Sequence, residues 1–109
     1  MILQSKEMKF VVLVGDAVEI IRTLPCRHGT EDIYHADIKD RAQRELGKRL
    51  SCPGGGRIHI DHLGKVVTAY RRSSAYGRAE PETVRRLLAK VMEEEGLQGY
   101  TLEVDMDVS

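Results

Sequence analysis

Hydrophobic residues recur with two different periods along this chain, and the order of those periods limits the folds it can adopt. Continuous or alternating apolar residues are typical of β-strands, and they occupy residues 9–14, 18–24, 57–62, 66–70 and 101–108. Apolar residues three or four positions apart are typical of amphipathic helices, and they occupy residues 33–50 and 81–95. This order predicts one α+β domain over residues 1–109, arranged ββαββαβ, with a mixed β-sheet and two packed helices.

The first helix is predicted from about Ile33 to Leu50. Five apolar residues fall four positions apart and are expected to share one buried face: Tyr34, Ile38, Ala42, Leu46 and Leu50. The second helix is predicted to begin at Pro81, because proline suits the first helical position, and Gly96 can end it.

The composition is that of a soluble globular protein, with 41% hydrophobic and 31% charged residues. The formal net charge is zero, which argues against a general nucleic-acid binder, because binding to a phosphate backbone needs unbalanced Lys and Arg side chains. No segment has the length of a membrane span, and the first residues lack the pattern of a signal peptide. Two cysteines, Cys26 and Cys52, do not suggest a disulfide framework. We therefore expect a cytoplasmic monomer without nucleic-acid or membrane partners.

Residues 52–58, CPGGGRI, place three consecutive glycines before Arg57. Ordered glycines lose much conformational entropy, so the triplet needs a geometric reason. One reason is a tight turn. The other is close approach of backbone N–H groups to an anion, with Arg57 as a two-pronged donor. A nucleotide-binding P-loop would need Lys followed by Ser or Thr at this point.

Cys52 and Arg57 offer a further alternative, a cysteine-dependent phosphatase loop. Such a loop places five residues between cysteine and arginine, whereas this chain has four. A strand also follows, so the helix N-terminus that would lower the thiol pKa is absent. The pattern therefore favours a Cys52 without a catalytic role.

His35 is the histidine best placed for chemistry. It lies where the chain enters the first predicted helix, whose positive end disfavours the imidazolium form and attracts anions. A neutral ring could act as a base or a nucleophile, although a histidine at a helix start can equally be a capping or packing residue. His59 and His62 should point to opposite faces of a strand, and no group of residues has metal-ligand spacing. We expect neither a metal nor another cofactor.

Residues 73–77, SSAYG, combine small side chains, two hydroxyl groups and neighbouring arginines. This composition suits a surface loop, and it also suits a set of hydroxyl and backbone donors around a phosphoryl group.

Three separated motifs resemble those of the phosphohistidine phosphatases, also called the Janus/Ocnus family: YHADI at 34–38, GGGRI at 54–58 and SSAYG at 73–77. The resemblance runs from about residue 9 to the end of the chain. It implies that His35 is the catalytic histidine and that no metal is required. It also implies a set of residues that hold the phosphoryl group, namely Lys9, Arg57, Ser73, Ser74 and Ala75.

The resemblance predicts a metal-independent protein histidine phosphatase, which hydrolyses the P–N bond of phosphohistidine in partner proteins. His35 would act as general base or as nucleophile. Three departures from the family pattern leave this chemistry intact and bear on which protein can dock: a short N-terminal arm, the extra segment CRHGTED at 26–32, and Arg78 after Gly77. The alternative is a module that binds phosphoproteins or other anions without turnover.

Overall fold

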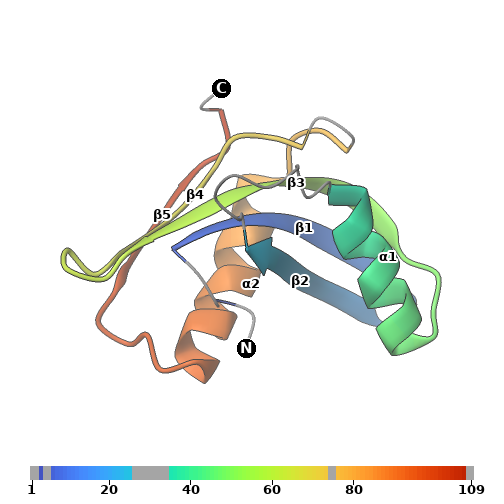
Figure 1. Ribbon diagram of the computed structural model, residues 1–109, viewed down its shortest axis with the longest axis horizontal. Helices are drawn as coiled ribbons and strands as arrows, with labels where there is room; N and C mark the ends of the chain where they lie inside the picture. Colours follow the sequence, from blue (N-terminus) through green and yellow to red (C-terminus); the bar gives the residue numbers. More distant parts are fainter. Residues whose placement is uncertain (1–2, 4–5, 26–34, 74–75, 108–109) are drawn as a thin grey trace.

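The part of the chain that the structure describes forms its helices and strands in the predicted order (Figure 1). The structure is a computed structural model, and it describes residues 3, 6–25, 35–73 and 76–107. The elements are β1 (Glu7–Gly15), β2 (Val18–Pro25), α1 (His35–Leu46), β3 (Ser51–Asp61), β4 (Val66–Tyr70), α2 (Pro81–Glu94) and β5 (Thr101–Asp105). The predicted α+β class is therefore confirmed.

The strands form one mixed sheet in the order β2-β1-β3-β4-β5. Neighbouring strands are antiparallel except β4 and β5, which are parallel and are connected through α2. A helical crossover is the usual connection between parallel neighbours. The two long central strands, β1 and β3, consequently lie between the β2 edge and the β4–β5 pair.

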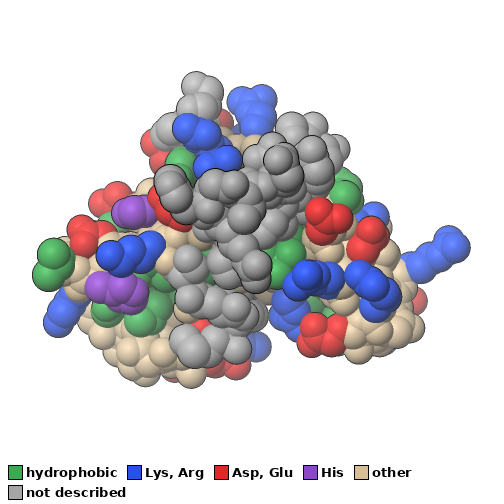
Figure 2. Space-filling model, viewed as in Figure 1, with side chains coloured by type: hydrophobic (Ala, Val, Ile, Leu, Met, Phe, Trp, Pro, Cys, Tyr) green, Lys and Arg blue, Asp and Glu red, His purple; other side chains and the backbone are tan. Residues whose placement is uncertain are grey.

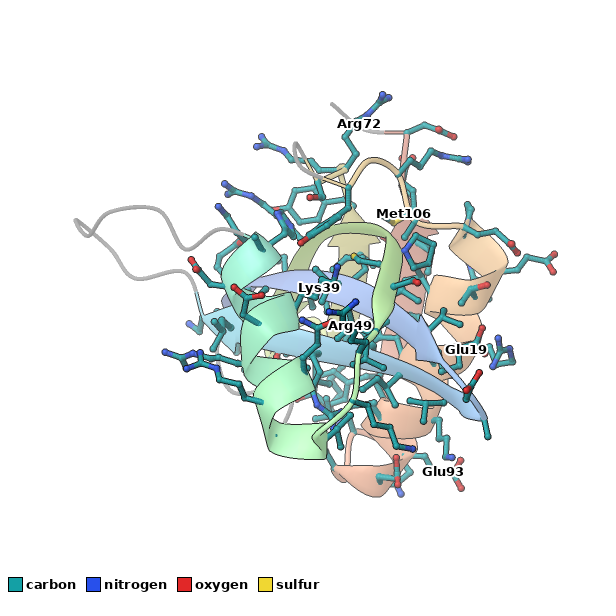
Figure 3. All side chains as sticks on the ribbon, turned by 90° about the vertical axis from the view of Figure 1, so that its right-hand side faces the viewer. Glu19, Lys39, Arg49, Arg72, Glu93 and Met106 are labelled. Carbon is teal, nitrogen blue, oxygen red and sulfur yellow. The ribbon has the colours of Figure 1, made fainter. Side chains whose placement is uncertain are left out.

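The helices lie on opposite sides of the sheet, as the edge-on view shows (Figure 3). On the α2 side, Phe10 and Ile58 are fully buried against Leu88. On the α1 side, Val11 and Leu13 pack against Ile38. Because alternate residues of β1 are buried on opposite faces, this strand has the continuous apolar sequence expected of a strand covered on both sides.

Helix α1 covers only the β1–β2 half of its side of the sheet. The His35 ring of α1 lies against Gly55 and Gly56 of β3, and beyond this contact no helix among the described residues packs on the same face of β3 from Arg57 onward, or of β4 and β5. We call this part of the sheet the open face. It carries two rows of paired residues that cross the strands: Lys9, Arg57, Tyr70 and Asp105 in the first, and Glu7, His59, Thr68 and Glu103 in the second.

The predicted end of the first helix was wrong. Helix α1 ends at Leu46, and Gly47 follows with a left-handed φ of 63°. Leu46 is 36% exposed, whereas Leu50 is buried outside the helix, against Val11 and Leu13. A step of four residues overshoots the helical period, so each successive residue turns about 40° further round the axis. Over the 16 residues from Tyr34 to Leu50 this rotation adds up, so the first and last of these apolar residues would not share one face of a helix. The predicted start of the helix at Ile33 lies outside the described residues.

The last strand is also shorter than predicted, because β5 ends at Asp105 and Met106 is buried in the turn that follows. The second helix begins at Pro81 as predicted, and Gly96 follows its end with a φ of 79°. No helix within the described ranges is long and apolar enough to cross a membrane.

Candidate functional site

His35 is the first described residue of α1, and its ring is held against the sheet. The side chain is 6% exposed, and Nε2 lies 2.9 Å from the carbonyl oxygen of Gly56 in β3. A carbonyl oxygen can only accept a hydrogen bond, so Nε2 carries the proton and donates. The other ring nitrogen, Nδ1, is then left with a lone pair, as a base or a nucleophile requires.

The surroundings of His35 favour this neutral form of the ring. Burial lowers the pKa of His35 from its ordinary value of 6.5, and the positive charges of Lys9 and Arg57 lower it further. The hydrogen bond to Gly56 opposes this shift without reversing it. His35 is thus a neutral imidazole beside two cations.

Lys9 and Arg57 are brought together by the pairing of β1 with β3. Their Cα atoms are direct partners in this antiparallel ladder, so both side chains leave the sheet on the same face. Like charges placed directly opposite each other repel, and a bound anion would relieve this repulsion. Residues 48 positions apart in the sequence thus form a cationic pair within electrostatic reach of His35.

The glycine triplet lies inside β3, so a tight turn, one of the two reasons considered for it, is not the explanation. The sequence suggested that the glycine N–H groups approach an anion. The N–H of Gly55 instead donates to the carbonyl of Gly77, 3.2 Å away, and is not available for this role. A Cβ atom on Gly55 would lie 2.4 Å from the carbonyl oxygen of Phe10, 3.1 Å from the His35 ring and 3.4 Å from Ser73 Cβ. The missing side chain lets strand, helix and loop approach one another.

The flanking glycines have the same role towards other segments. A Cβ atom on Gly54 would lie 2.5 Å from the backbone nitrogen of Ala79, and one on Gly56 would lie 2.6 Å from the carbonyl oxygen of Tyr70. Such separations are too short for real atoms, so the triplet is required by close packing of the protein's own backbone.

Ser73 belongs to the third motif and lies next to Gly55 and His35. It is 2% exposed, and its backbone exchanges two hydrogen bonds with Gly77, of 3.0 and 2.8 Å. Its hydroxyl oxygen accepts a hydrogen bond from Tyr76 N–H at 3.1 Å. Ser74 and Ala75, which the family resemblance also implicates, lie outside the described residues. The described parts of all three motifs nevertheless meet at Gly55.

Cys52 has the environment of an unreactive thiol. Burial raises the pKa of Cys52 above its ordinary value, and the thiol donates to the carbonyl of Gly54 at 3.4 Å. A nucleophilic cysteine needs the opposite shift. The alternative of a cysteine-dependent phosphatase therefore has no support from this site.

Sequence reasoning did not identify Tyr70 as part of this region. Its Cα atom is the direct partner of Arg57 in the β3–β4 ladder, and its hydroxyl donates to Glu7 Oε2 at 3.2 Å. Glu7 also lies 2.6 Å from His59 Nδ1. The short turn Leu63-Gly64-Lys65 joins β3 to β4 and determines which residues pair across them, including Arg57 with Tyr70. This turn was the sequence signal from which the position of Tyr70 could have been found.

Among the described residues, no three potential ligands lie close enough to hold a metal ion.

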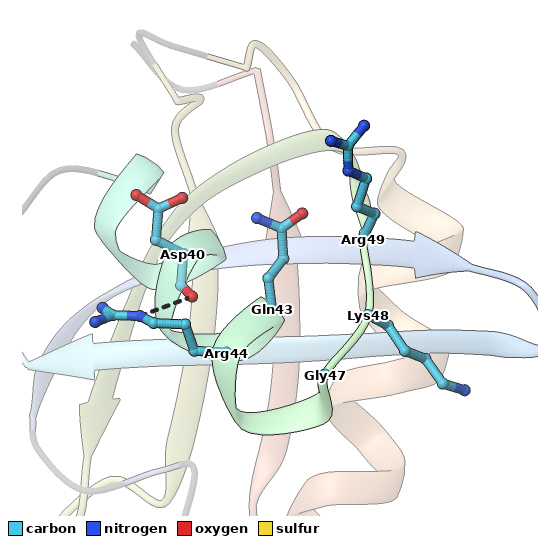
Figure 4. Close-up of a pocket in the computed structure, with 6 residues that line it drawn as sticks. All are labelled: Asp40, Gln43, Arg44, Gly47, Lys48 and Arg49. Atoms are coloured by element: carbon cyan, nitrogen blue, oxygen red, sulfur yellow. Dashed lines mark hydrogen bonds between the residues drawn. The ribbon is translucent and has the colours of Figure 1, made fainter.

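A hollow of about 680 Å³ lies away from these residues, at the C-terminal end of α1 (Figure 4). Its lining includes three cationic residues, Arg44, Lys48 and Arg49. Arg44 donates to the carbonyl of Asp40, and Gln43 accepts from Leu50 N–H at 2.9 Å. No residue of the three motifs lines this hollow, so the chemistry is better sought at His35.

Comparison with known proteins agrees with this arrangement. The sequence profile of the Janus/Ocnus family matches residues 7–95. The sex-regulated protein janus-A of Drosophila yakuba is 41% identical over 59 residues, which cover 51% of this chain and 44% of that protein. The 14 kDa phosphohistidine phosphatase of Sus scrofa is 36% identical over 69 residues, which cover 61% of this chain and 51% of that protein. This chain therefore spans about half the length of the curated relatives that it matches. Because the profile covers most of the chain, including all three motifs around His35, the protein belongs to the Janus/Ocnus family.

Proposed function

We propose that this protein is a metal-independent histidine phosphatase that hydrolyses the P–N bond of phosphohistidine in other proteins. The observation that carries the proposal is the geometry of His35, whose Nε2–H is tied to Gly56 while Nδ1 keeps its lone pair beside Lys9 and Arg57. The similarity to the pig protein named a 14 kDa phosphohistidine phosphatase supports the same reaction class.

In this proposal Lys9 and Arg57 bind the phosphoryl oxygens, and the segment 73–75 completes the binding site. Phosphoryl transfer passes through a loose transition state, so holding these oxygens and aligning a nucleophile supplies most of the catalysis. The phosphohistidine ring reacts with its other nitrogen protonated, so that as the water oxygen bonds to phosphorus, the P–N bond breaks and its electrons leave with a neutral imidazole. The water proton passes to Nδ1 of His35. Alternatively, Nδ1 itself attacks phosphorus, and water then hydrolyses the phosphorylated His35.

Arg57→Ala is expected to lower kcat/KM by about 100-fold to 1,000-fold, in line with the loss of one charged donor to the transition state. Arg57→Lys should recover only part of this loss, because it keeps the charge without the two-pronged donor. The measurement is release of inorganic phosphate from a phosphohistidine peptide in excess chelator.

Arg41→Ala is the matched control, since Arg41 is an exposed residue of α1. The proposal fails if the unaltered protein releases no phosphate, or if Arg57→Ala is as active as Arg41→Ala. Saturable peptide binding without phosphate release would instead favour the binding module.

The pKa of His35 is expected to rise when the charge of Lys9 is removed. Lys9 favours the neutral ring, so Lys9→Gln should shift the titration towards higher pH. NMR titration of the ring protons, with His35→Gln used to assign the signals, measures the shift directly. In the unaltered protein the midpoint should lie below 6.5, the ordinary value for histidine. A midpoint above 6.5, or no response to Lys9→Gln, would contradict the electrostatic account of the site.

A further inference from the structure

The open face extends from the proposed phosphoryl site to β5. Its side chains are cationic at the site and acidic on β5. The first row of paired residues begins with Lys9 and Arg57 and ends with Asp105. The second row ends with Glu103, which pairs with Thr68. This side of the molecule faces the viewer in Figure 2, where histidine and charged side chains lie over the β3–β4–β5 part of the sheet.

A groove of about 410 Å³ lies on this face, lined by His59, Thr68, Tyr70, Glu103 and Asp105. It is contiguous with the proposed site, because Tyr70 pairs with Arg57 and His59 is two residues from Arg57 on the same strand. The surface of the groove is mostly apolar, to which the Tyr70 ring can contribute, and it carries the carboxylates of Glu103 and Asp105.

The two acidic residues of the groove, Glu103 and Asp105, differ from the nearby acidic residues Glu7 and Asp107 in their ion pairing. Glu7 contacts His59, and Asp107 lies 2.8 Å from Arg78. By contrast, Glu103 and Asp105 are exposed on β5 and form no ion pair with another described residue. They therefore present uncompensated negative charge beside a cationic site.

We propose that this groove binds the segment of the substrate protein next to its phosphohistidine and selects a lysine or arginine there. The proposal rests on the proposed phosphatase function and names a feature of its substrates. A long cationic side chain can lay its methylene groups on the Tyr70 ring and direct its charge towards Glu103 and Asp105. Acidic segments would be repelled by the same two carboxylates.

The geometry predicts where this basic residue lies. Arg57 and Asp105 are two strands apart, which corresponds to about 10 Å between their backbones. An extended peptide advances about 3.3 Å per residue. With the phosphoryl group at Arg57, the residue about three positions from the phosphohistidine reaches Asp105.

The test compares two phosphohistidine peptides, one with lysine and one with alanine at the third position on both sides of the histidine. We expect kcat/KM to be about tenfold higher for the lysine peptide, an effect that corresponds to about 1.4 kcal/mol. In the double variant Glu103→Gln, Asp105→Asn this ratio should fall to about one. The preference of the unaltered protein should also weaken as salt is added, because the groove is exposed.

The matched control is the double variant Glu93→Gln, Glu94→Gln, which changes the net charge equally at exposed positions of α2. It should keep the lysine preference. The proposal is overturned if the unaltered protein has no preference, if a glutamate peptide is preferred, or if the control variant loses the preference to the same extent.

Failure of the proposed function would look different, because neither peptide would then release phosphate. Titration of the unphosphorylated lysine peptide, followed by the amide NMR signals of Thr68, Tyr70 and Asp105, tests the groove independently. Shifts of these signals that are weaker with the alanine peptide would support the groove, and unchanged signals would overturn it.

Discussion

Gly55→Ala is expected to lower the free energy of unfolding by about 3 kcal/mol or more, at the upper end of the cost of overpacking a core. The added Cβ atom would lie 2.4 Å from the carbonyl oxygen of Phe10, a backbone atom of the central strand β1. Backbone atoms cannot rotate away, so β1 and β3 would have to separate. Because small domains are stable by only about 5–15 kcal/mol, such a loss is readily measured by urea unfolding.

Gly47→Ala provides the control for this result. Gly47 has a φ of 63°, and no other atom lies within 4 Å of an added Cβ. Its replacement should cost about 1 kcal/mol, the usual penalty for an ordinary residue in the left-handed region. If Gly55→Ala proves no more destabilising than Gly47→Ala, close packing does not explain the triplet.

His35→Gln is expected to lower kcat for phosphate release by about 100-fold to 10,000-fold, the usual contribution of a positioned base. Glutamine can still donate an N–H to the carbonyl of Gly56, but it offers no basic nitrogen at the position of Nδ1. The variant should therefore fold and bind substrate without turnover. His62→Ala is the control, since His62 is exposed and bonded to the Tyr100 hydroxyl.

The same variant separates the two chemical routes left open for His35. If Nδ1 attacks phosphorus, rapid quenching should trap an acid-labile, alkali-stable phosphoryl group on the unaltered protein and none on His35→Gln. If His35 acts on water, no adduct forms in either protein. Turnover by His35→Gln at the rate of the unaltered protein would exclude both routes.

The order of the helices and strands was predictable because each element has its own hydrophobic period. That period can be recognised from the local sequence alone, without knowing which elements pack against it. The end of α1 was not, since apolar spacing alone does not show that Leu50 packs from outside the helix. The glycines were misread for a related reason. A glycine required by backbone conformation and one required by a neighbouring carbonyl are identical in sequence, and only the tertiary structure separates them.

The candidate site was predictable only in part. Family resemblance pointed to Lys9, His35, Arg57 and Ser73, and the structure places the His35 ring and the Ser73 side chain at Gly55, two residues before Arg57 on β3. Local sequence contains no information on the β1–β3 register that sets Lys9 opposite Arg57. The position of Tyr70 depends on the register of a second ladder, for which the Leu-Gly-Lys turn was the available signal.

The separation of the two cations is fixed by backbone pairing between β1 and β3, the two central strands of the sheet. Insertions or exchanges in the surrounding loops would leave this spacing untouched. Under the proposed function, these two cations would therefore keep their hold on a phosphoryl group while the loops that contact a partner protein are exchanged.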